Sequence, residues 1–507
     1  MSYDIIIIGT GAGGGTLAAK LAPTGKKILI LERGGYIPKE KANWDTVEVF
    51  NNAKYKAKEP WVDSEGKEFH PGIHYCVGGN TKFYGAALLR MRSEDFDELN
   101  HHGGVSPAWP IKYEDLKPYY LTAENMYHVH GERGADPTEP AEENPYPEEA
   151  LVHEPRIQEL YDDIKELGLN PFPLPMGEKL DKENPLVLDR FDGFPDPTES
   201  KGDSHVMGVN VALEHPNVEM KINAEVTQLI TNEKGDKITQ VKTIIDGKEE
   251  LLEAGTIIVS CGAINSAALL LKSTSDKHPN GLANGSGVVG RNYMCHNNSA
   301  MVALSKKPNP TVFGKTWGLN DFYFKGDEKF PHPMGHIQML AKSDPDMFKG
   351  DAPGFVPGFT LDLMASHALD FWMTSEDLPD PENRVVVLED GNIQLNYKEN
   401  NKKSHEHLER KLKWILEHVG CETHILPNNI YLGKKIPLAG TAHQCGTVRF
   451  GTDPATSALD TNCKSHEVDN LYVVDGSFFP SSSAVNPALT IMAQALRVGD
   501  HLIDNIL

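Results

Sequence analysis

The chain has 507 residues, of which 39% are hydrophobic and 24% charged, and its formal net charge is −23. This length exceeds what one hydrophobic core supports, so we expect two or three domains of ordinary globular composition. The acidic balance excludes nucleic acid as an expected partner, because phosphate backbones would be repelled, and it fits a soluble enzyme.

The cysteines and the N-terminus indicate a reducing compartment. The six cysteines form no CxxC pair, and none stands at zinc-finger spacing from a histidine, so we expect reduced thiols and no metal site. No lysine or arginine precedes the isoleucine run at residues 5–8, and no stretch is long enough to span a bilayer. We therefore expect a cytoplasmic protein with no membrane partner.

Near the start of the chain, an apolar strand runs straight into a glycine-rich loop. The stretch YDIIIIGTGAGGGTLAAKLA places Gly9, Gly11 and Gly14 in the GxGxxG spacing between a strand and a helix. Gly9 permits a tight turn, Gly11 lets the backbone approach a pyrophosphate, and Gly14 lets helix and strand pack closely. The N-terminus of the helix favours negative charge, so the pattern predicts a dinucleotide site.

A second strand, KKILILE, ends in Glu32. A carboxylate at this point accepts hydrogen bonds from ribose hydroxyls and repels a 2′-phosphate, which disfavours NADP. These residues leave open whether the other half of the dinucleotide is nicotinamide or flavin.

Two further segments suit the same kind of site. The stretch HYCVGGNTKFYGAALLRMR contains Gly78, Gly79 and Asn80, and it suits a close approach to a flat ligand or a plain turn between strand and helix. At the far end, NLYVVDGS predicts a short strand that ends at Asp475 and Gly476. The following stretch, NPALTIMAQALRVGDHLI, predicts a helix with Pro487 in its first turn. This strand and helix can complete the sheet that begins at the N-terminus.

Between these segments the pattern changes twice. Residues 217–251 predict strands joined by turns, residues 256–271 a strand entering a helix, and residues 109–129 an amphipathic helix. Residues 136–155 and 170–180 look like irregular surface loops. From residue 301 onward, strands are predicted at 299–305, 318–324, 334–342 and in a hairpin at 384–397. A helix is predicted at 402–420, with Gly420 as its C-cap. Three aromatic residues of this part could stack on a sugar but are expected in the core: Trp317, Phe371 and Trp372.

Together these segments resemble the glucose–methanol–choline (GMC) oxidoreductase family, whose motif order they follow over most of the chain. The six segments are GTGAGGG…LERGG, VGGNTKFYGA, VSCGAINSAALLLKS, VGRNYMCH, HQCGT and VVDGSFFPSSSAVNPALTIMAQA. The resemblance implies an α/β fold with a Rossmann-like FAD domain of residues 1–100, 205–300 and 435–507. It also implies an inserted substrate domain on an antiparallel sheet, formed by residues 101–204 and 301–434.

The resemblance also implies which residues hold the cofactor. Gly9, Gly11, Gly14 and Glu32 match the ADP-binding positions; the other matching positions are Gly78, Gly79, Asn80, Val226, Asp475, Gly476 and Pro487. Among these, Val226 is expected to contact adenine through its backbone. Some relatives attach flavin to a histidine in the second glycine loop. Residues 77–84 contain none, although His74 lies just upstream, so non-covalent FAD is expected.

For the chemistry, the resemblance implies His443 and Asn486. His443 would accept the hydroxyl proton of an alcohol, and the Asn486 amide would hold the substrate, since it cannot take up a proton. Both are expected where a strand or helix begins, and Asn486 could also serve as a helix N-cap. Cys445 is expected to be a packing residue. His296 could line a wall of the site, although a structural role is the favoured interpretation.

Within the family, the chain looks most similar to bacterial glycoside 3-oxidases and pyranose oxidases. This resemblance implies oxidation of a secondary hydroxyl, at C3 of a glucose-type ring, with O2 as the acceptor and hydrogen peroxide as a product. Three alternatives stay open: a dehydrogenase that uses a quinone or another carrier, a lyase on the same fold, and a non-enzymatic flavin-fold escort protein. The number of subunits is not predicted.

Overall fold

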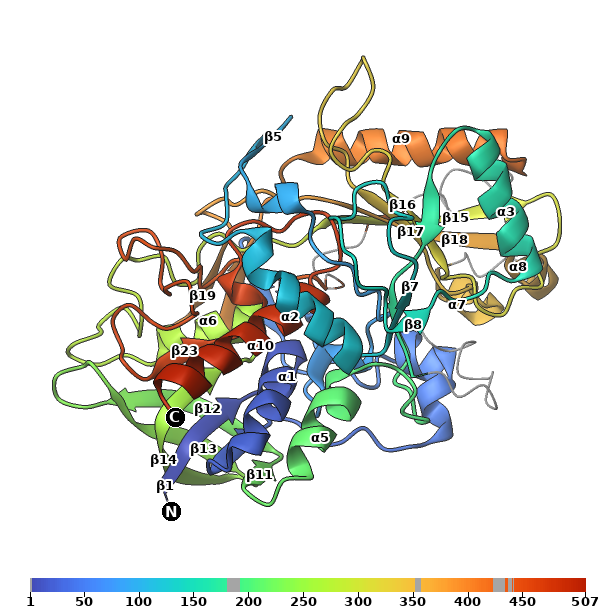
Figure 1. The fold of residues 1–507 in the computed structure, drawn as a ribbon. Helices are drawn as coiled ribbons and strands as arrows, with labels where there is room; N and C mark the ends of the chain where they lie inside the picture. The colour runs from blue at the N-terminus through green and yellow to red at the C-terminus, as the bar shows by residue number, and fades with distance from the viewer. Residues whose placement is uncertain (1, 180–191, 352–356, 423–433, 436–439, 441) are drawn as a thin grey trace.

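The computed structural model of the chain describes residues 2–179, 192–351, 357–422, 434–435, 440 and 442–507. Two large sheets dominate this part of the chain, one mainly parallel and one antiparallel. Figure 1 shows them at opposite ends of the molecule, with both chain termini beside the first sheet.

The first sheet is assembled from segments that lie far apart in the sequence. Its parallel part has the order β11 (Val218–Lys221), β2 (Ile28–Leu31), β1 (Ser2–Ile8) and β14 (Lys248–Val259), and β23 (Leu471–Val473) also pairs in parallel with β14. Strands β12 (Ala224–Thr231) and β13 (Ile238–Ile245) extend it through antiparallel pairing to the first half of β14. The four isoleucines of β1 are buried, as a central parallel strand requires. This sheet confirms the expected α/β fold of discontinuous segments.

Helices cover the first sheet. Helix α1 (Ala12–Leu21) packs against α10 (Ala488–Asn505), which in turn packs against α2 (Tyr113–Met126). Figure 1 shows these three helices side by side. Helix α6 (Ala263–Lys272) follows β14, and the short α5 (Asn210–Leu213) lies beside α1. The strand-to-helix transition that was predicted at 256–271 is therefore observed.

Glycines allow α1 to come unusually close to the sheet. A Cβ atom at Gly13 would lie 1.9 Å from the carbonyl oxygen of Val474, directly after β23. A Cβ atom at Gly14 would lie 2.1 Å from the Gly9 oxygen. The sequence assigned the approach of helix to strand to Gly14, which meets Gly9 directly after β1, and Gly13 makes a second close approach, at the end of β23.

The second sheet is antiparallel throughout. Its order is β21 (Cys421–Glu422), β15 (Asn297–Ser305), β18 (Ala368–Ser375), β17 (His336–Met339), β16 (Trp317–Leu319) and β9 (Pro171–Pro173), and β22 (Lys434–Lys435) also pairs with β15. Helix α9 (Lys402–His418) packs on β15 and β18, and α3 (Pro155–Glu166) packs beside β9. Trp317 and Phe371 are fully buried with ring centroids 5.9 Å apart, which confirms their assignment to the core, whereas Trp372 is half-buried.

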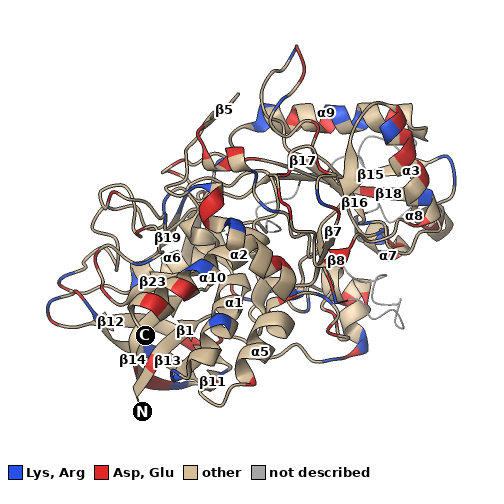
Figure 2. Cartoon of the chain, viewed as in Figure 1, with Lys and Arg blue, Asp and Glu red and all other residues tan. Residues whose placement is uncertain are grey.

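Charged residues mark the outer faces of the helices. Figure 2 shows lysine, arginine, aspartate and glutamate alternating along α9, at the surface above the second sheet. The inward face of α9 is apolar and buries Leu408, Leu412 and Ile415. This amphipathic pattern is the reason why the helix was predictable from sequence. Within the described residues, no helix has both the length and the hydropathy needed to cross a lipid bilayer.

The remaining elements are short. They are β3 (Trp61–Asp63), β4 (Glu68–Phe69), β5 (Leu99–His101), β6 (Gly104–Ser106), β7 (Val129–Gly131), β8 (Glu148–Glu149), β10 (Met176–Gly177), β19 (Arg384–Val387), β20 (Ile393–Asn396), α7 (Pro345–Asp351) and α8 (Gly358–His367). The predicted hairpin turn at Asp390 and Gly391 is present, but its strands β19 and β20 join β3 and β4 in a separate sheet.

Several sequence expectations for the segments outside the first sheet were wrong or incomplete. Strands β9 and β10 lie in the described part of residues 170–180, which were expected to be irregular. The prolines of this stretch suggested a loop, but proline is also compatible with an edge strand such as β9. Helix α3 and strand β18 were not predicted. The strand expected at 318–324 ends at Leu319, since the residues after it form a turn.

The close approach at Gly13 gives a first prediction. We expect Gly13→Ala to lower the apparent melting temperature by several degrees, because the new methyl group meets a backbone carbonyl and overpacking costs about 1–3 kcal/mol or more. The matched control is Gly358→Ala at the first position of α8, where nothing lies within 4 Å of the new Cβ atom. Equal thermal unfolding of both variants, measured by circular dichroism, would contradict the role of Gly13.

Candidate active site

The two glycine loops lie against each other at the end of β1. Thr10 joins them, because its hydroxyl donates to the Glu32 carboxylate and accepts the Gly78 N–H at 2.9 Å. A Cβ atom at Gly79 would lie 3.5 Å from the Gly11 Cα atom. Gly78 and Gly79 adopt φ angles of +94° and +53°, which favour glycine. The backbone of the second loop therefore packs directly against the first loop.

Glu32 is buried at the end of β2. Its Oε1 accepts the Gly34 N–H at 2.9 Å, and its Oε2 accepts the Thr10 N–H at 3.2 Å. Burial raises the pKa of this carboxyl, against the lowering effect of these hydrogen bonds. The Glu32 carbonyl accepts the Ala224 N–H at 2.9 Å, so the strand that carries Val226 begins beside it.

The N-terminus of α1 offers room and polarity for an anion. Gly11 is the N-cap, no side chain caps the helix, and its first turn contains no acidic residue. Nothing lies within 4 Å of the position that a Gly11 Cβ atom would take. A helix N-terminus of this kind accepts a pyrophosphate, so the residues present fit a dinucleotide.

Asp475 ties the C-terminal segment to α6. Its Oδ2 accepts the Gly262 N–H at 3.0 Å and the Ser266 hydroxyl, and its Oδ1 accepts the Ser477 N–H at 2.8 Å. Its side chain is thus fully engaged in hydrogen bonds within the protein, which leaves only its backbone for the cofactor contact that was expected. Gly476 lies close to the segment that carries the predicted base. A Cβ atom added at Gly476 would lie 2.6 Å from the carbonyl oxygen of Gln444.

Three side chains from distant segments meet next to this framework. His443 Nε2 lies 3.4 Å from Asn486 Nδ2, and His443 Nδ1 lies 2.9 Å from His296 Nδ1. His443 and Asn486 are half-buried, whereas His296 is buried. His443 has a φ angle of +57° and begins no strand, contrary to expectation; the nearest pairing is a bridge between Met294 and Cys445.

His296 belongs to this cluster, so the favoured interpretation of a merely structural histidine was incomplete. Its Nε2 lies 3.2 Å from the Ser482 carbonyl oxygen, which can only accept, so this nitrogen carries a proton. In a neutral ring, Nδ1 of His296 is then an acceptor and receives the Nδ1–H of His443. This directionality leaves the Nε2 of His443 as a lone pair that faces Asn486.

The electrostatics of the cluster keep its imidazoles neutral. Burial lowers the pKa of His296 to about 4. Burial, with smaller effects of His296, Lys315 and His336, holds the pKa of His443 well below its usual range. His336 on β17 has a pKa lowered to about 4, chiefly by burial, and its ring contacts Asn320 Oδ1 at 2.7 Å. At neutral pH, His443 is therefore in the form that accepts a proton.

The other predicted residues have mainly supporting positions. The exposed Asn80 accepts the His74 N–H at 3.0 Å, and the His74 ring stacks on Phe83 at 3.8 Å. Cys445 is buried in the core. Pro487 is itself the N-cap of α10, so Asn486 precedes the helix and does not cap it.

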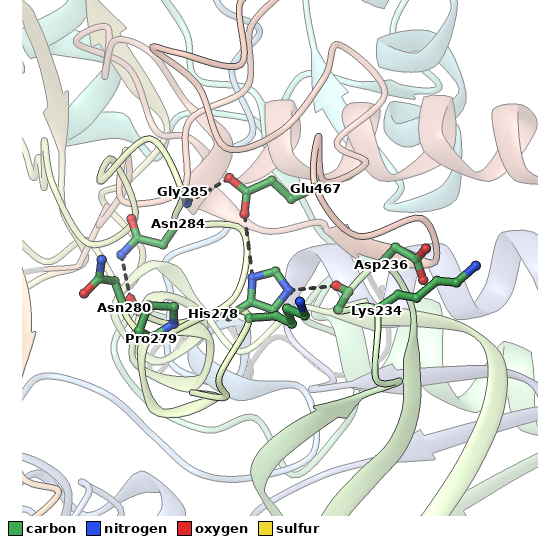
Figure 3. A pocket seen from close by; sticks show the side chains of 11 residues that line it. Lys234, Asp236, His278, Pro279, Asn280, Asn284, Gly285 and Glu467 are labelled. Atoms are coloured by element: carbon green, nitrogen blue, oxygen red, sulfur yellow. Dashed lines mark hydrogen bonds and ion pairs between the residues drawn. The ribbon is translucent and has the colours of Figure 1, made fainter.

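Two surface hollows contain none of the predicted site residues. Figure 3 shows one of about 260 Å³, in which His278 donates from Nε2 to the Gly235 carbonyl at 2.7 Å and the Gly285 N–H donates to Glu467 at 2.8 Å. Another, of about 340 Å³, lies beside α9 and includes Phe330. The contacts of the histidine cluster and of the glycine loops, and not these hollows, are the basis on which we place the candidate active site.

A dinucleotide fold with a neutral imidazole beside an amide defines the class of a cofactor-dependent oxidoreductase. Two family models, both described as GMC oxidoreductase, match residues 3–298 and 428–495. The chain belongs to the GMC oxidoreductase family, which binds FAD, and the expected resemblance is confirmed.

Relatives of known activity match nearly the whole chain. Paromamine 6′-oxidase of Streptomyces fradiae is 28% identical over 98% of this chain and 90% of its own length. 6‴-Hydroxyparomomycin C oxidase of Streptomyces lividus is 27% identical over 99% and 92%. The large subunit of fructose dehydrogenase from Gluconobacter japonicus is 26% identical over 100% and 98%. Pyridoxine 4-oxidase from Mesorbium loti shares the fold, with a TM-score of 0.68 and 16% identity over the full length of both chains.

The contact between His296 and His443 gives a second prediction. We expect His296→Ala to lower kcat/KM roughly tenfold, because the loss of one orienting hydrogen bond is worth about 1–2 kcal/mol. It should also shift the acid limb of the pH profile to higher pH, since His296 helps to lower the pKa of His443. His296→Asn is the matched control: its Oδ1 replaces the accepting Nδ1, so most activity should return. If the acid limb is the same in the His296→Ala variant and the parent, His296 does not act through His443.

Proposed function

We propose that this chain is an FAD-dependent enzyme that oxidises an alcohol group of a sugar or glycoside to the carbonyl. The observation that carries the proposal is the 3.4 Å distance between His443 Nε2 and the Asn486 amide, with the lone pair assigned to Nε2 by the hydrogen bonds of His296. A non-enzymatic flavin-fold protein has no need of such a pair. The family and the sugar-directed names of the relatives support the same reading.

The cofactor would be held by the two glycine loops and by the C-terminal segment. Gly11 and the start of α1 would receive the pyrophosphate, Glu32 the ribose, and the backbone at Val226 the adenine. Gly78, Gly79, Asp475 and Gly476 would enclose the flavin half through their backbones. We further propose residues 1–100, 205–300 and 435–507 as the FAD domain, residues 101–204 and 301–434 as the substrate domain, and non-covalent attachment.

The protein side chains divide the work on the alcohol. His443 Nε2 accepts the hydroxyl proton, and Asn486 Nδ2 donates a hydrogen bond to the hydroxyl oxygen and so fixes the direction of the C–H bond. FAD supplies the acceptor for the hydride that leaves the carbon. The neutral state of His443 is what allows the first of these events at neutral pH.

The position on the sugar and the final acceptor are finer parts of the proposal. The resemblance to glycoside 3-oxidases favours C3 of a glucose-type ring, whereas the names of two relatives point to 6′ and 6‴ positions of aminoglycosides. NMR spectra of the product separate a ketone at C3 from an aldehyde at C6. O2 with release of hydrogen peroxide is the proposed acceptor.

A dehydrogenase that passes electrons to a quinone is the second candidate, supported by the similarity to fructose dehydrogenase. Peroxide release compared with dye reduction decides between the two acceptors. The first experiment on substrate is a panel of glucosides and aminoglycosides, scored by anaerobic bleaching of the flavin.

The proposed base gives a third prediction. We expect His443→Ala to retain yellow, bound FAD but to reduce the rate of flavin bleaching roughly 10²–10⁴-fold, the usual contribution of a general base. In the unaltered enzyme, kcat/KM should stay constant from neutral pH to well below 6.5. It should fall only as pH drops through the lowered pKa, since protonation removes the base. The control is His418→Ala, at the exposed end of α9, which should bleach at the native rate. Native bleaching rates in the His443 variant would place the base elsewhere.

The open space at Gly11 gives a fourth prediction. We expect Gly11→Ala to weaken FAD binding roughly tenfold or more, because the methyl group takes the space through which a pyrophosphate approaches the backbone. The melting temperature of the cofactor-free protein should stay unchanged, since the new Cβ atom meets nothing and the backbone is extended. Fluorescence titration with FAD measures the affinity, with Gly358→Ala as control. Unchanged affinity would contradict the placement of the pyrophosphate.

A further inference from the structure

An ion pair lies directly on the second glycine loop. Lys315 Nζ is 3.0 Å from Asp192 Oδ2, and the Lys315 side chain is only 3% exposed. A Cβ atom at Gly85 would lie 2.0 Å from Lys315 Nζ and 2.0 Å from Asp192 Oδ1. Both polar atoms therefore touch the backbone of the loop that we propose as part of the flavin site.

The pair has hydrogen-bonding capacity that the described residues do not use. An ammonium group has three donors, and within the described part of the chain Asp192 is the one acceptor that Lys315 Nζ reaches. Oδ2 of Asp192 also accepts from the Ala341 N–H at 3.4 Å, whereas Oδ1 receives no donor from those residues. Buried donors without acceptors are costly, so the arrangement is suited to a polar ligand.

The position of the pair connects it to the proposed base. Lys315 lies two residues before the start of β16, and His336 lies on the neighbouring β17. After burial, Lys315 and His336 are among the groups that lower the pKa of His443. The pair therefore stands on the second glycine loop, and its lysine is close enough to influence the pKa of the proposed base.

The charges of the pair indicate the class of ligand. The ammonium and the carboxylate cancel, so an anionic ligand would meet Asp192 and a cationic one would meet Lys315. A donor beside an acceptor matches two neighbouring hydroxyl groups, one accepting from Nζ and the other donating to Oδ1. We propose that Lys315 and Asp192 form a subsite for two adjacent hydroxyls of a neutral sugar ring, an inference that rests on the proposed function.

The test removes both charges together. Single substitutions would leave an unpaired buried charge, whereas replacing a buried pair by apolar residues of similar volume is often neutral for stability. The double variant Lys315→Met/Asp192→Leu is therefore made in the His443→Ala background, in which turnover should be slow enough for sugar binding to be measured. Binding of methyl glucoside and its monodeoxy analogues is measured from the perturbation of the flavin spectrum. The control is Lys242→Met/Glu249→Leu, a partly exposed pair at 2.8 Å between β13 and β14.

With Lys315 and Asp192 present, loss of one of two adjacent hydroxyls should weaken binding roughly tenfold or more. In the double variant, the parent sugar should bind as weakly as those deoxy analogues, whereas the control pair should change nothing. Unchanged sugar affinity in the double variant would overturn the subsite. The subsite would also be overturned if the His443→Ala variant with Lys315 and Asp192 intact bound every deoxy analogue as tightly as the parent sugar, while sugars still bleached the wild-type flavin. If no sugar bleaches the wild-type flavin, the proposed function fails and the subsite with it.

Discussion

The contact of α1 with the end of β23 is the constraint on which the site depends. The Val474 carbonyl stands where a side chain on Gly13 would have to lie, and the Ser260 hydroxyl donates to the same oxygen at 2.7 Å. This contact joins the first glycine loop to a strand near the end of the chain. Asp475 and Gly476 follow at once and fix α6 and the segment that carries His443. One close backbone approach thus aligns the anion site with the proposed base.

The second constraint is electrostatic. The protein as a whole is strongly acidic, yet the surroundings of His443 contain neutral imidazoles and a lysine that is paired with a carboxylate. Burial penalises the charged form of each imidazole, and every ring has a hydrogen-bond partner. The low pKa of His443 is therefore a consequence of packing between the two sheets, as well as of neighbouring charge.

Local sequence patterns correctly predicted those helices, strands and loops whose structure depends mainly on neighbouring residues. The isoleucines before Gly9, the glycine spacing, the amphipathic α9 and the apolar β23 each follow from neighbouring residues alone. Strand β18 escaped prediction because it lies in the middle of the second sheet, where apolar residues do not alternate clearly with polar ones. Strand β9 escaped because two of its three residues are proline.

In the candidate site, the sequence predicted only those residues that belong to recognisable motifs. His443 and Asn486 follow from the resemblance, but the partnership of His296 with His443 spans 147 positions and depends on how β15 begins. The left-handed backbone of His443 likewise comes from tertiary contacts, because nothing in its own sequence requires it. Asp192 and Lys315 carry no motif, lie 123 positions apart and meet beside Gly85.

The order of hydrogen bonds in the cluster explains why one imidazole, and not another, faces the substrate side. The Ser482 carbonyl fixes the proton of His296, His296 fixes the proton of His443, and the remaining lone pair can only be His443 Nε2. Asn486 cannot take up a proton, so of these two side chains only His443 can act as a base. Reversing this order would require a protonated His296, which its pKa of about 4 disfavours throughout the neutral range. The fold thus selects the tautomer before any alcohol arrives.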